Sequence, residues 1–187
     1  LHVTVDMEDR HFTDVTLRLF KALRDQFDNV GTVLQSRLFR TKDDILALHA
    51  RRCKVRICIG IYKEPRDVAY VDKPAMKERL FEYVQLLLDK GHYPEIATHD
   101  EPLIRRVIDA RDKLGCPKDA YEIQLLLGVP RQRIQEQTGR DGRAMRPHVP
   151  YPAGGDDAGH DCPRRTACTP ARGHAAARGP APGNPPS

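Results

Sequence analysis

Polar side chains recur near the carboxyl ends of the apolar runs in this chain. Asp6 follows HVTV, and Arg56 lies inside the apolar run VRICIG. A buried guanidinium is costly unless it faces an anion, so we expect Arg56 to face a carboxylate or an anionic ligand. Asp6 is the candidate partner, since a carboxylate holds an arginine by charge-assisted hydrogen bonds. Capping of the following loop is the alternative role for Asp6.

Three further polar residues are suited to binding a ligand. Gln35 follows GTVL, and a buried amide offers donors and an acceptor to the polar edge of a heteroaromatic ring. A hydrogen bond to the backbone would satisfy it equally well. Thr98 and His99 precede a helix start, where free N–H groups bind phosphate. Ordinary capping by Asp100 is the alternative there. The spacing of the histidines and acids does not support a metal site.

Strand-like and helix-like segments alternate along the first 151 residues. We expect strands at 2–7, 29–39, 54–60, 94–100, 121–128 and 144–151. Helices are expected at 14–27, 42–51, 73–90, from the turn containing Pro102 to about Leu114, and at 130–137. This rhythm is typical of βαβ units and a parallel sheet.

The ends of two helices and the buried face of one are also predicted. A stripe at every fourth position, Val15, Leu19, Leu23 and Phe27, predicts the buried face of helix 14–27, with Thr13 as its N-cap. The pattern from Thr41 to Asp44 resembles a capping box and predicts the start of helix 42–51.

Two α/β architectures fit this order of elements. An open doubly wound sheet would carry one dominant glycine-rich loop after its first strand, but neither GxGxxG nor GxxxxGK[ST] occurs. A parallel barrel gathers its site from the carboxyl ends of several strands, which matches the polar residues above. We therefore predict a partial (β/α)8 TIM-type barrel with about six of the eight βα units.

Composition divides the 187-residue chain near residue 151. Residues 152–187 are mostly Ala, Pro, Gly and Arg, and we expect them to be disordered; their abrupt onset also resembles a shifted reading frame.

The net charge of +5 is spread among acids, which indicates a solvated surface and no nucleic-acid partner. Five cysteines without CxxC spacing indicate reduced thiols and a cytoplasmic protein. The oligomeric state stays open.

Six motifs taken together resemble the proline dehydrogenase family, especially its short bacterial monofunctional type. They are VDMED, NVGTVLQSRLFRT, VRICIGIYKEPRDVAY, IATHD, YEIQLLLGV and HVPY, in this order over residues 1–151. The resemblance implies an FAD-dependent barrel flavoprotein of proline catabolism that oxidises L-proline to 1-pyrroline-5-carboxylate. Hydride would pass to flavin N5 and electrons to a quinone at the membrane surface. By the family pattern, the chain starts at the third strand.

The resemblance also assigns roles to individual residues. Asp6 matches the active-site aspartate, and Arg56 matches the arginine near flavin N5. Other positions match residues that contact the cofactor: Met7, Gln35, Ile59, Gly60, Ile61, Thr98 and His99. Gly60 would let the backbone approach the flavin because it has no side chain.

The chain departs from the family pattern at several of these positions. Ile59 stands where the family has lysine, Ile61 where it has alanine, and His148 where it has tyrosine. Pro152 replaces a glycine, and the paired arginine that clamps the substrate carboxylate is not found at its place. We therefore expect weak or no turnover. A non-enzymatic barrel remnant and a barrel enzyme acting on phosphorylated substrates are the alternatives.

Overall fold

The structure is a computed structural model that describes residues 1–126 and 142–148. Its elements are β1 (Val3–Val5), α1 (Thr13–Gln26), β2 (Val30–Gln35), α2 (Thr41–Leu46), β3 (Lys54–Cys58), α3 (Lys73–Asp89), β4 (Tyr93–Ala97), α4 (Glu101–Lys113), β5 (Glu122–Leu126) and β6 (Ala144–His148). The helix expected at 130–137 and the tail 152–187 lie outside these residues, so the predicted domain boundary stays a prediction.

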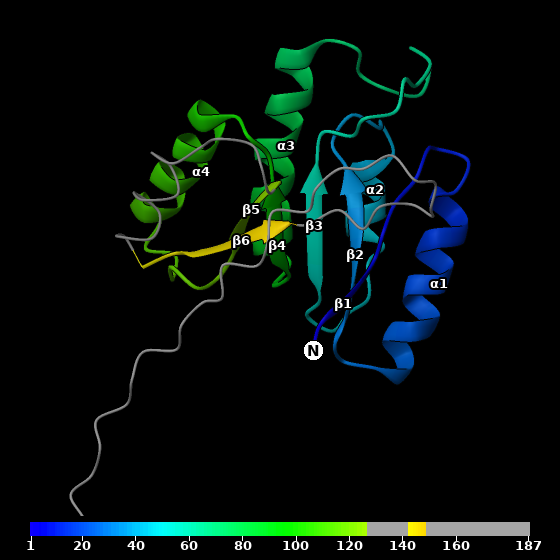
Figure 1. The fold of residues 1–187 in the computed structure, drawn as a ribbon, viewed down its shortest axis with the longest axis horizontal. Helices are drawn as coiled ribbons and strands as arrows, with labels where there is room; N and C mark the ends of the chain where they lie inside the picture. Colours follow the sequence, from blue (N-terminus) through cyan, green and yellow to red (C-terminus); the bar gives the residue numbers. More distant parts are fainter. Residues whose placement is uncertain (127–141, 149–187) are drawn as a thin grey trace, which may run out of the picture. The chain divides into compact units, whose positions relative to one another are not determined.

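The six strands form one parallel sheet in the order of the sequence, from β1 to β6. The sheet curls, and the described helices lie along its outer side (Figure 1). A doubly wound sheet reverses its strand order at a switch point, whereas this order never reverses. The doubly wound alternative is therefore wrong, and the predicted partial barrel is confirmed.

Side chains of the central strands alternate between an apolar outer face and a polar inner face. Val55, Ile57 and Ile96 point to the helices and are at most 1% exposed. Burial of each such side chain contributes about 1.5–3 kcal/mol. Arg56 and Glu95 occupy the intervening positions and are register partners in β3 and β4. The period of two along each strand thus separates the hydrophobic core from the residues that can do chemistry.

Helices α3 and α4 begin with aspartate caps. The Asp72 carboxylate accepts a hydrogen bond from the Ala75 N–H at 3.0 Å, and Asp100 accepts one from the Leu103 N–H at 2.9 Å. A proline stands in the first turn of both helices. These caps satisfy N–H groups that would otherwise lack an intrahelical partner, so they fix where each helix starts. Neither helix, nor any other described one, is long and apolar enough to cross a membrane.

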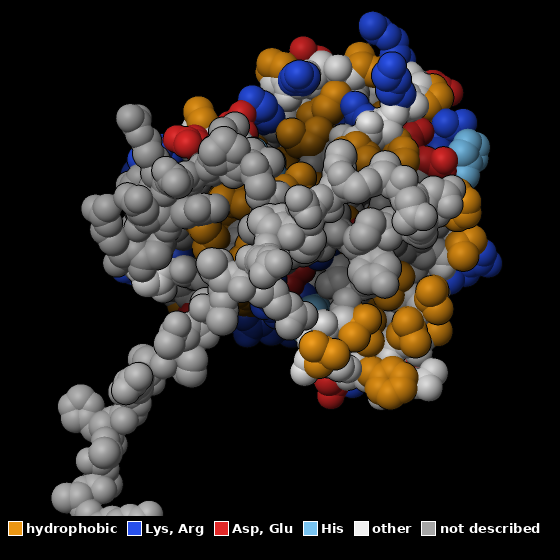
Figure 2. Space-filling model, in the orientation of Figure 1, with side chains coloured by type: hydrophobic (Ala, Val, Ile, Leu, Met, Phe, Trp, Pro, Cys, Tyr) orange, Lys and Arg blue, Asp and Glu red, His pale blue; other side chains and the backbone are white. Residues whose placement is uncertain are grey.

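The predicted buried face of α1 is wrong at three of its four positions. Leu23 packs against the core as expected, but Val15, Leu19 and Phe27 are each at least half exposed, and apolar side chains gather along the edge of the molecule that α1 occupies (Figure 2). The buried face instead includes Leu17 and Phe20. Thr13 is the first helical residue, and no side chain caps the helix, so its predicted role as N-cap is also wrong.

A buried arginine explains why the buried face of α1 differs from the apolar stripe. The guanidinium of Arg24 donates to the carbonyl oxygens of Phe27 at 3.0 Å and Arg52 at 2.6 Å. These bonds satisfy the two terminal nitrogens of the guanidinium while its aliphatic stem packs inward; its Nε is buried with no hydrogen-bond partner among the described residues. A prediction from hydrophobic spacing alone assumes that arginine points to solvent. It therefore places the buried face of α1 on the wrong side of the helix.

The region after β2 is shorter and more sharply turned than expected. β2 ends at Gln35, and α2 spans only Thr41–Leu46. The Thr41 hydroxyl donates to the Gln35 carbonyl at 2.5 Å, so it ties the helix start to the strand and does not cap the helix. Ser36 donates its hydroxyl to the Met76 carbonyl at 3.0 Å, which anchors this turn to α3. The predicted capping box is therefore wrong.

Candidate active site

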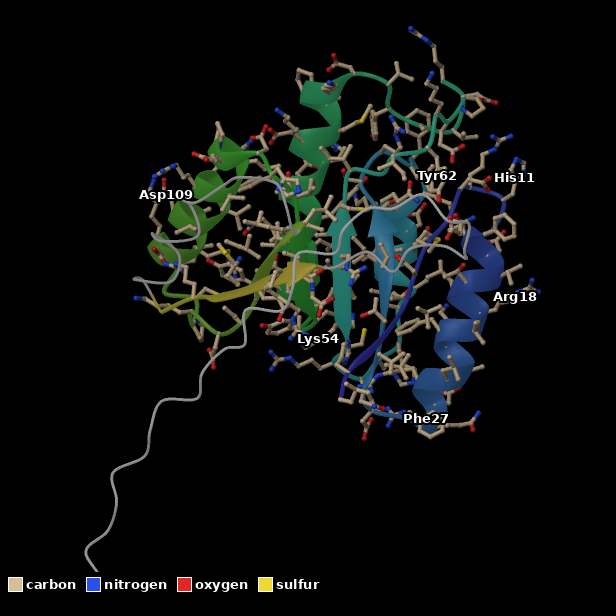
Figure 3. The ribbon with its side chains drawn as sticks, viewed as in Figure 1. His11, Arg18, Phe27, Lys54, Tyr62 and Asp109 are labelled. Carbon is tan, nitrogen blue, oxygen red and sulfur yellow. The ribbon has the colours of Figure 1, made fainter. Side chains whose placement is uncertain are left out.

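A cleft of about 430 Å³ opens at the carboxyl ends of the strands. Tyr62 lies at this end of the sheet and Lys54 at the opposite end (Figure 3). All nine residues expected at the site line this cleft: Asp6, Met7, Gln35, Arg56, Ile59, Gly60, Ile61, Thr98 and His99. The sequence spreads them over 94 positions, and the parallel order of β1 to β4 brings them together.

Arg56 faces Asp6, as expected, but its shorter contact is to another residue. The distance from Arg56 Nη1 to Asp6 Oδ1 is 3.7 Å, which is an ion pair and too long for a hydrogen bond. Arg56 Nε donates to Gln124 Oε1 at 2.7 Å. The Asp6 carboxylate is largely exposed, whereas the Arg56 side chain is mostly buried. Gln124 therefore holds the Nε side of the Arg56 guanidinium by a hydrogen bond, and the guanidinium faces the cleft beside Asp6.

Gln35 presents a buried acceptor to the cleft. Its amide nitrogen donates to the Glu8 carbonyl at 2.7 Å, and its Oε1 is buried with no hydrogen-bond partner among the described residues. An acceptor left unpaired in a buried position costs about 1–3 kcal/mol. A bound ligand with an N–H donor would remove that cost. Gln35 therefore fits a heteroaromatic ring with an N–H edge.

Gly60 makes room for this amide. Its φ of +96° is strained for other residues, and a Cβ there would lie 2.3 Å from Gln35 Oε1. We expected glycine at this position to admit a ligand close to the backbone. The structure adds a nearer reason, since any side chain would displace the Gln35 amide.

The five remaining predicted residues also lie around the cleft, and Met7 is buried there. Ile59 is half-buried and packs against the main core, whereas Ile61 is 87% exposed at the rim. Thr98 accepts a hydrogen bond from the Asp100 N–H at 3.2 Å. His99 Nε2 accepts one from the Leu126 N–H at 3.3 Å, which ties its ring to the end of β5. Asp100 caps α4, which was the alternative role expected for this turn.

A second, basic hollow of about 450 Å³ shares Ile59, Gly60, Thr98 and His99 with the cleft. Arg37 lines it, and the Arg37 Nε is buried with no hydrogen-bond partner among the described residues. A buried guanidinium N–H without a partner suits an anionic group such as phosphate. The two hollows together fit an elongated ligand with an N–H edge at one end and negative charge at the other.

Several residues of the cleft were not singled out from the sequence. The Tyr62 hydroxyl donates to the Glu8 carboxylate across the mouth, and this bond is the main reason that the pKa of Tyr62 rises to about 12. Beneath them, Glu64 accepts from the Arg10 N–H at 2.9 Å and pairs with its guanidinium at 3.3 Å. These contacts join the loop after β1 to the loop after β3. Only the polar spacing Asp6-x-Glu8 could have indicated this from the sequence.

Gln124 counts among the polar residues of the fifth predicted strand, but the sequence alone assigned it no role. It lies on the inner face of β5 and lines the cleft. The signal was the alternation of Glu122 and Gln124 with apolar residues, which predicts that both point to the same face. The sequence did not indicate that this face also carries Arg56.

A parallel βα sheet with a cleft at the carboxyl ends of its strands is the arrangement of barrel enzymes. No family model matches the chain. It is 39% identical over 151 residues to a proline dehydrogenase of Deinococcus radiodurans, and 36% identical over 149 residues to proline dehydrogenase 2 of Bacillus subtilis. Each alignment covers 80% of this chain, and respectively 48% and 49% of the relative. Over 80% of its length the chain is therefore similar to proline dehydrogenases, and it spans about half the length of these relatives.

Solved structures agree with the fold. A proline utilization A (PutA) from Bdellovibrio bacteriovorus, inactivated by N-propargylglycine, matches with a TM-score of 0.72 at 23% identity over 80% of this chain and 18% of that chain. A PutA with proline bound in remote sites matches with a TM-score of 0.66 at 20% identity over 79% and 17%. These likenesses confirm the barrel fold. Together with the curated relatives, they do not favour either alternative function.

Proposed function

We propose that this chain forms the flavin-binding part of a proline dehydrogenase. In this proposal FAD is the cofactor, L-proline is oxidised to 1-pyrroline-5-carboxylate, and a quinone at the membrane surface is the final acceptor. The observation that carries the proposal is the convergence of all nine residues assigned by family resemblance on one cleft at the carboxyl ends of parallel strands.

The residues of both hollows fit FAD. Gln35 would offer its unpaired acceptor to the N–H edge of the ring system, and Met7 and Gly60 would line it. Arg37, Thr98 and His99 would hold the anionic part of the cofactor, since they surround the basic hollow. FAD would supply the two-electron acceptor, while the protein orients it and sets its electrostatic environment.

The chain's own charges define what the protein would contribute. Arg56 places a fixed cation beside the ring site, and a cation there stabilises negative charge that develops during reduction. Tyr62 and Glu8, which both line the cleft, are joined by a hydrogen bond. Pro152, where the sequence departs from the family pattern, lies outside the described residues. We propose flavin binding with weak turnover of proline.

FAD binding to the purified full chain tests this proposal. We expect flavin fluorescence to be quenched on titration with FAD, and the bound flavin to be slowly bleached by L-proline without oxygen. Gln35→Leu should weaken FAD binding about tenfold, because one buried hydrogen bond is worth about 1.4 kcal/mol. Gln26→Leu, at an exposed position on α1, is the matched control and should bind FAD normally. A chain that cannot be loaded with FAD at all would contradict the proposal.

A further inference from the structure

A line of hydrogen bonds leads from Arg56 into the polar inner face of the sheet. Gln124 Oε1 accepts from Arg56 Nε at 2.7 Å, and Gln124 Nε2 donates to Glu122 Oε1 at 2.8 Å. Gln124 is buried, so no bulk water competes for its amide. One side chain therefore connects the cation of the cleft to a carboxylate two residues earlier on the same strand.

Glu122 fixes which way the Gln124 amide points. Arg146 Nε lies 2.9 Å from Glu122 Oε1, and Lys54 Nζ lies 3.4 Å from Oε2. Burial alone would raise the pKa of Glu122, but the Gln124 hydrogen bond and these cations lower it overall. Glu122 is then a carboxylate that can only accept hydrogen bonds. It must take the amide N–H of Gln124, which leaves the amide oxygen for Arg56.

This arrangement determines which nitrogens of Arg56 face the cleft. The Nε is engaged by Gln124, while Nη1 lies beside Asp6 at 3.7 Å. The Asp6 contact is too long to hold the guanidinium by itself, and the Asp6 carboxylate is mostly exposed. A free arginine side chain has many accessible rotamers, so it would sample many orientations without a tether. Gln124 supplies the tether.

We propose that Gln124, oriented by Glu122, is a positioning residue that fixes the guanidinium of Arg56 in the cleft. Gln124 acts through Arg56. Its effect on a bound flavin rests on the proposed function, whereas its effect on Arg56 is a property of the chain alone. The two effects can therefore be measured separately.

The first experiment needs no cofactor. In the full chain labelled with ¹⁵N-arginine, the Arg56 Nε–H signal is identified by its loss in Arg56→Lys, and its exchange with solvent is measured. We expect protection that falls at least tenfold in Gln124→Met, a variant of similar shape without the acceptor. Gln85→Met is the matched control, since Gln85 accepts from Arg111 at 2.7 Å on the helical side. It should leave the Arg56 signal unchanged.

Two results of this experiment would overturn the proposal. One is that the Arg56 Nε–H in the unmodified chain exchanges as fast as that of a free arginine. This measurement does not depend on the folding of any variant. The other is a Gln124→Met protein with a normal thermal midpoint and unchanged Arg56 exchange. Neither result depends on flavin binding, so failure of the proposed function would not be mistaken for failure of this one.

The second experiment uses the chain loaded with FAD. If Arg56 is no longer held near the ring, reduced flavin loses part of its electrostatic stabilisation. We expect Gln124→Met to lower the equilibrium constant for two-electron reduction about tenfold, which is about 30 mV, while Gln85→Met leaves it unchanged. A purely structural role would change the thermal midpoint and flavin content without this shift. An unchanged potential at full flavin loading would contradict positioning of Arg56 at the ring.

Discussion

Gly60 and Gln35 share one small volume at the floor of the cleft. A Cβ on Gly60 would lie 2.3 Å from Gln35 Oε1 and 3.1 Å from the side chain of Arg37. The amide stays in place because its nitrogen is bonded to the Glu8 carbonyl at 2.7 Å. The loops after β1, β2 and β3 thus depend on one another at Gly60, the residue that has no side chain.

Gly60→Ala tests this coupling. The positive φ costs about 1–2 kcal/mol for a residue with a side chain, and displacement of Gln35 costs about 1 kcal/mol more through its lost hydrogen bond. Gly91→Ala is the control, since Gly91 has a φ of +79° and a Cβ there would meet no described atom within 4 Å beyond its chain neighbours. Urea unfolding should show a larger loss for Gly60→Ala. Equal losses would mean that only backbone strain matters.

Glu95→Gln should stabilise the protein at neutral and alkaline pH. Burial, and then the neighbouring Glu122, raise the pKa of Glu95. The folded state therefore keeps a proton that the unfolded state has released, so stability falls as pH rises from about 4.5, the ordinary glutamate pKa, to the raised value. Glutamine has the same shape and no proton to lose. Thermal melts should show a gain of a few degrees near pH 8 that disappears below about pH 4.

Glu122→Gln is the counterpart with the opposite sign. The pKa of Glu122 is lowered overall because the bonds from Gln124, Lys54 and Arg146 outweigh its burial. Its carboxylate contributes stability above the ordinary pKa, and that contribution is lost as pH falls through the lowered value. The substitution should lower the thermal midpoint at neutral pH and have less effect in acid. A rise at neutral pH would show that Glu122 is not held as a carboxylate.

Ile59→Lys should tighten FAD binding. Ile59 is half-buried on the cleft wall, where a lysine would add positive charge beside an anionic cofactor. A charge at such a site is worth about 1 kcal/mol, or about fivefold in affinity. Ile61→Lys is the matched control, because Ile61 is 87% exposed and solvent screens its charge. Fluorescence titration with FAD compares them; equal effects would point to a general charge effect.

Glu64→Gln should weaken the contact between the loops after β1 and β3. Glu64 is buried and accepts from both the backbone N–H and the guanidinium of Arg10. The substitution should cost about 1–2 kcal/mol in urea unfolding, since the amide nitrogen of glutamine cannot accept and one of the two hydrogen bonds is lost. The exposed pair of Glu78 and Arg106 is the control, and Glu78→Gln should change stability by less than about 0.5 kcal/mol.

The strands could be predicted because their apolar runs are bounded by glycine, proline or polar residues. All six lie within the predicted segments or one residue outside them, although β2 ends four residues early, since Ser36 turns toward α3. The helix face of α1 could not be predicted in this way. Its orientation depends on carbonyl oxygens of Phe27 and Arg52 that satisfy Arg24, and one of these lies 28 residues away.

The cleft residues could be predicted because the family resemblance supplied them, and the barrel rhythm explained why they converge. The bond between Arg56 and Gln124 could not. It spans 68 residues and joins two strands separated by β4, so no local pattern contains it. The sequence did predict that Arg56 has a partner, since an arginine inside an apolar strand requires one. It did not predict which residue that partner is.

Each of the five strands β1 to β5 contributes to the cleft, through Asp6, Gln35, Arg56, Thr98 and Gln124. A ligand that touched all of them would act as a cross-brace over four hydrogen-bonded ladders at once. Separation of any of these four ladders would then release the ligand, so its binding energy would oppose each of them opening. At a hundred times its dissociation constant, such a ligand would add about 2.7 kcal/mol to the stability of the sheet from β1 to β5.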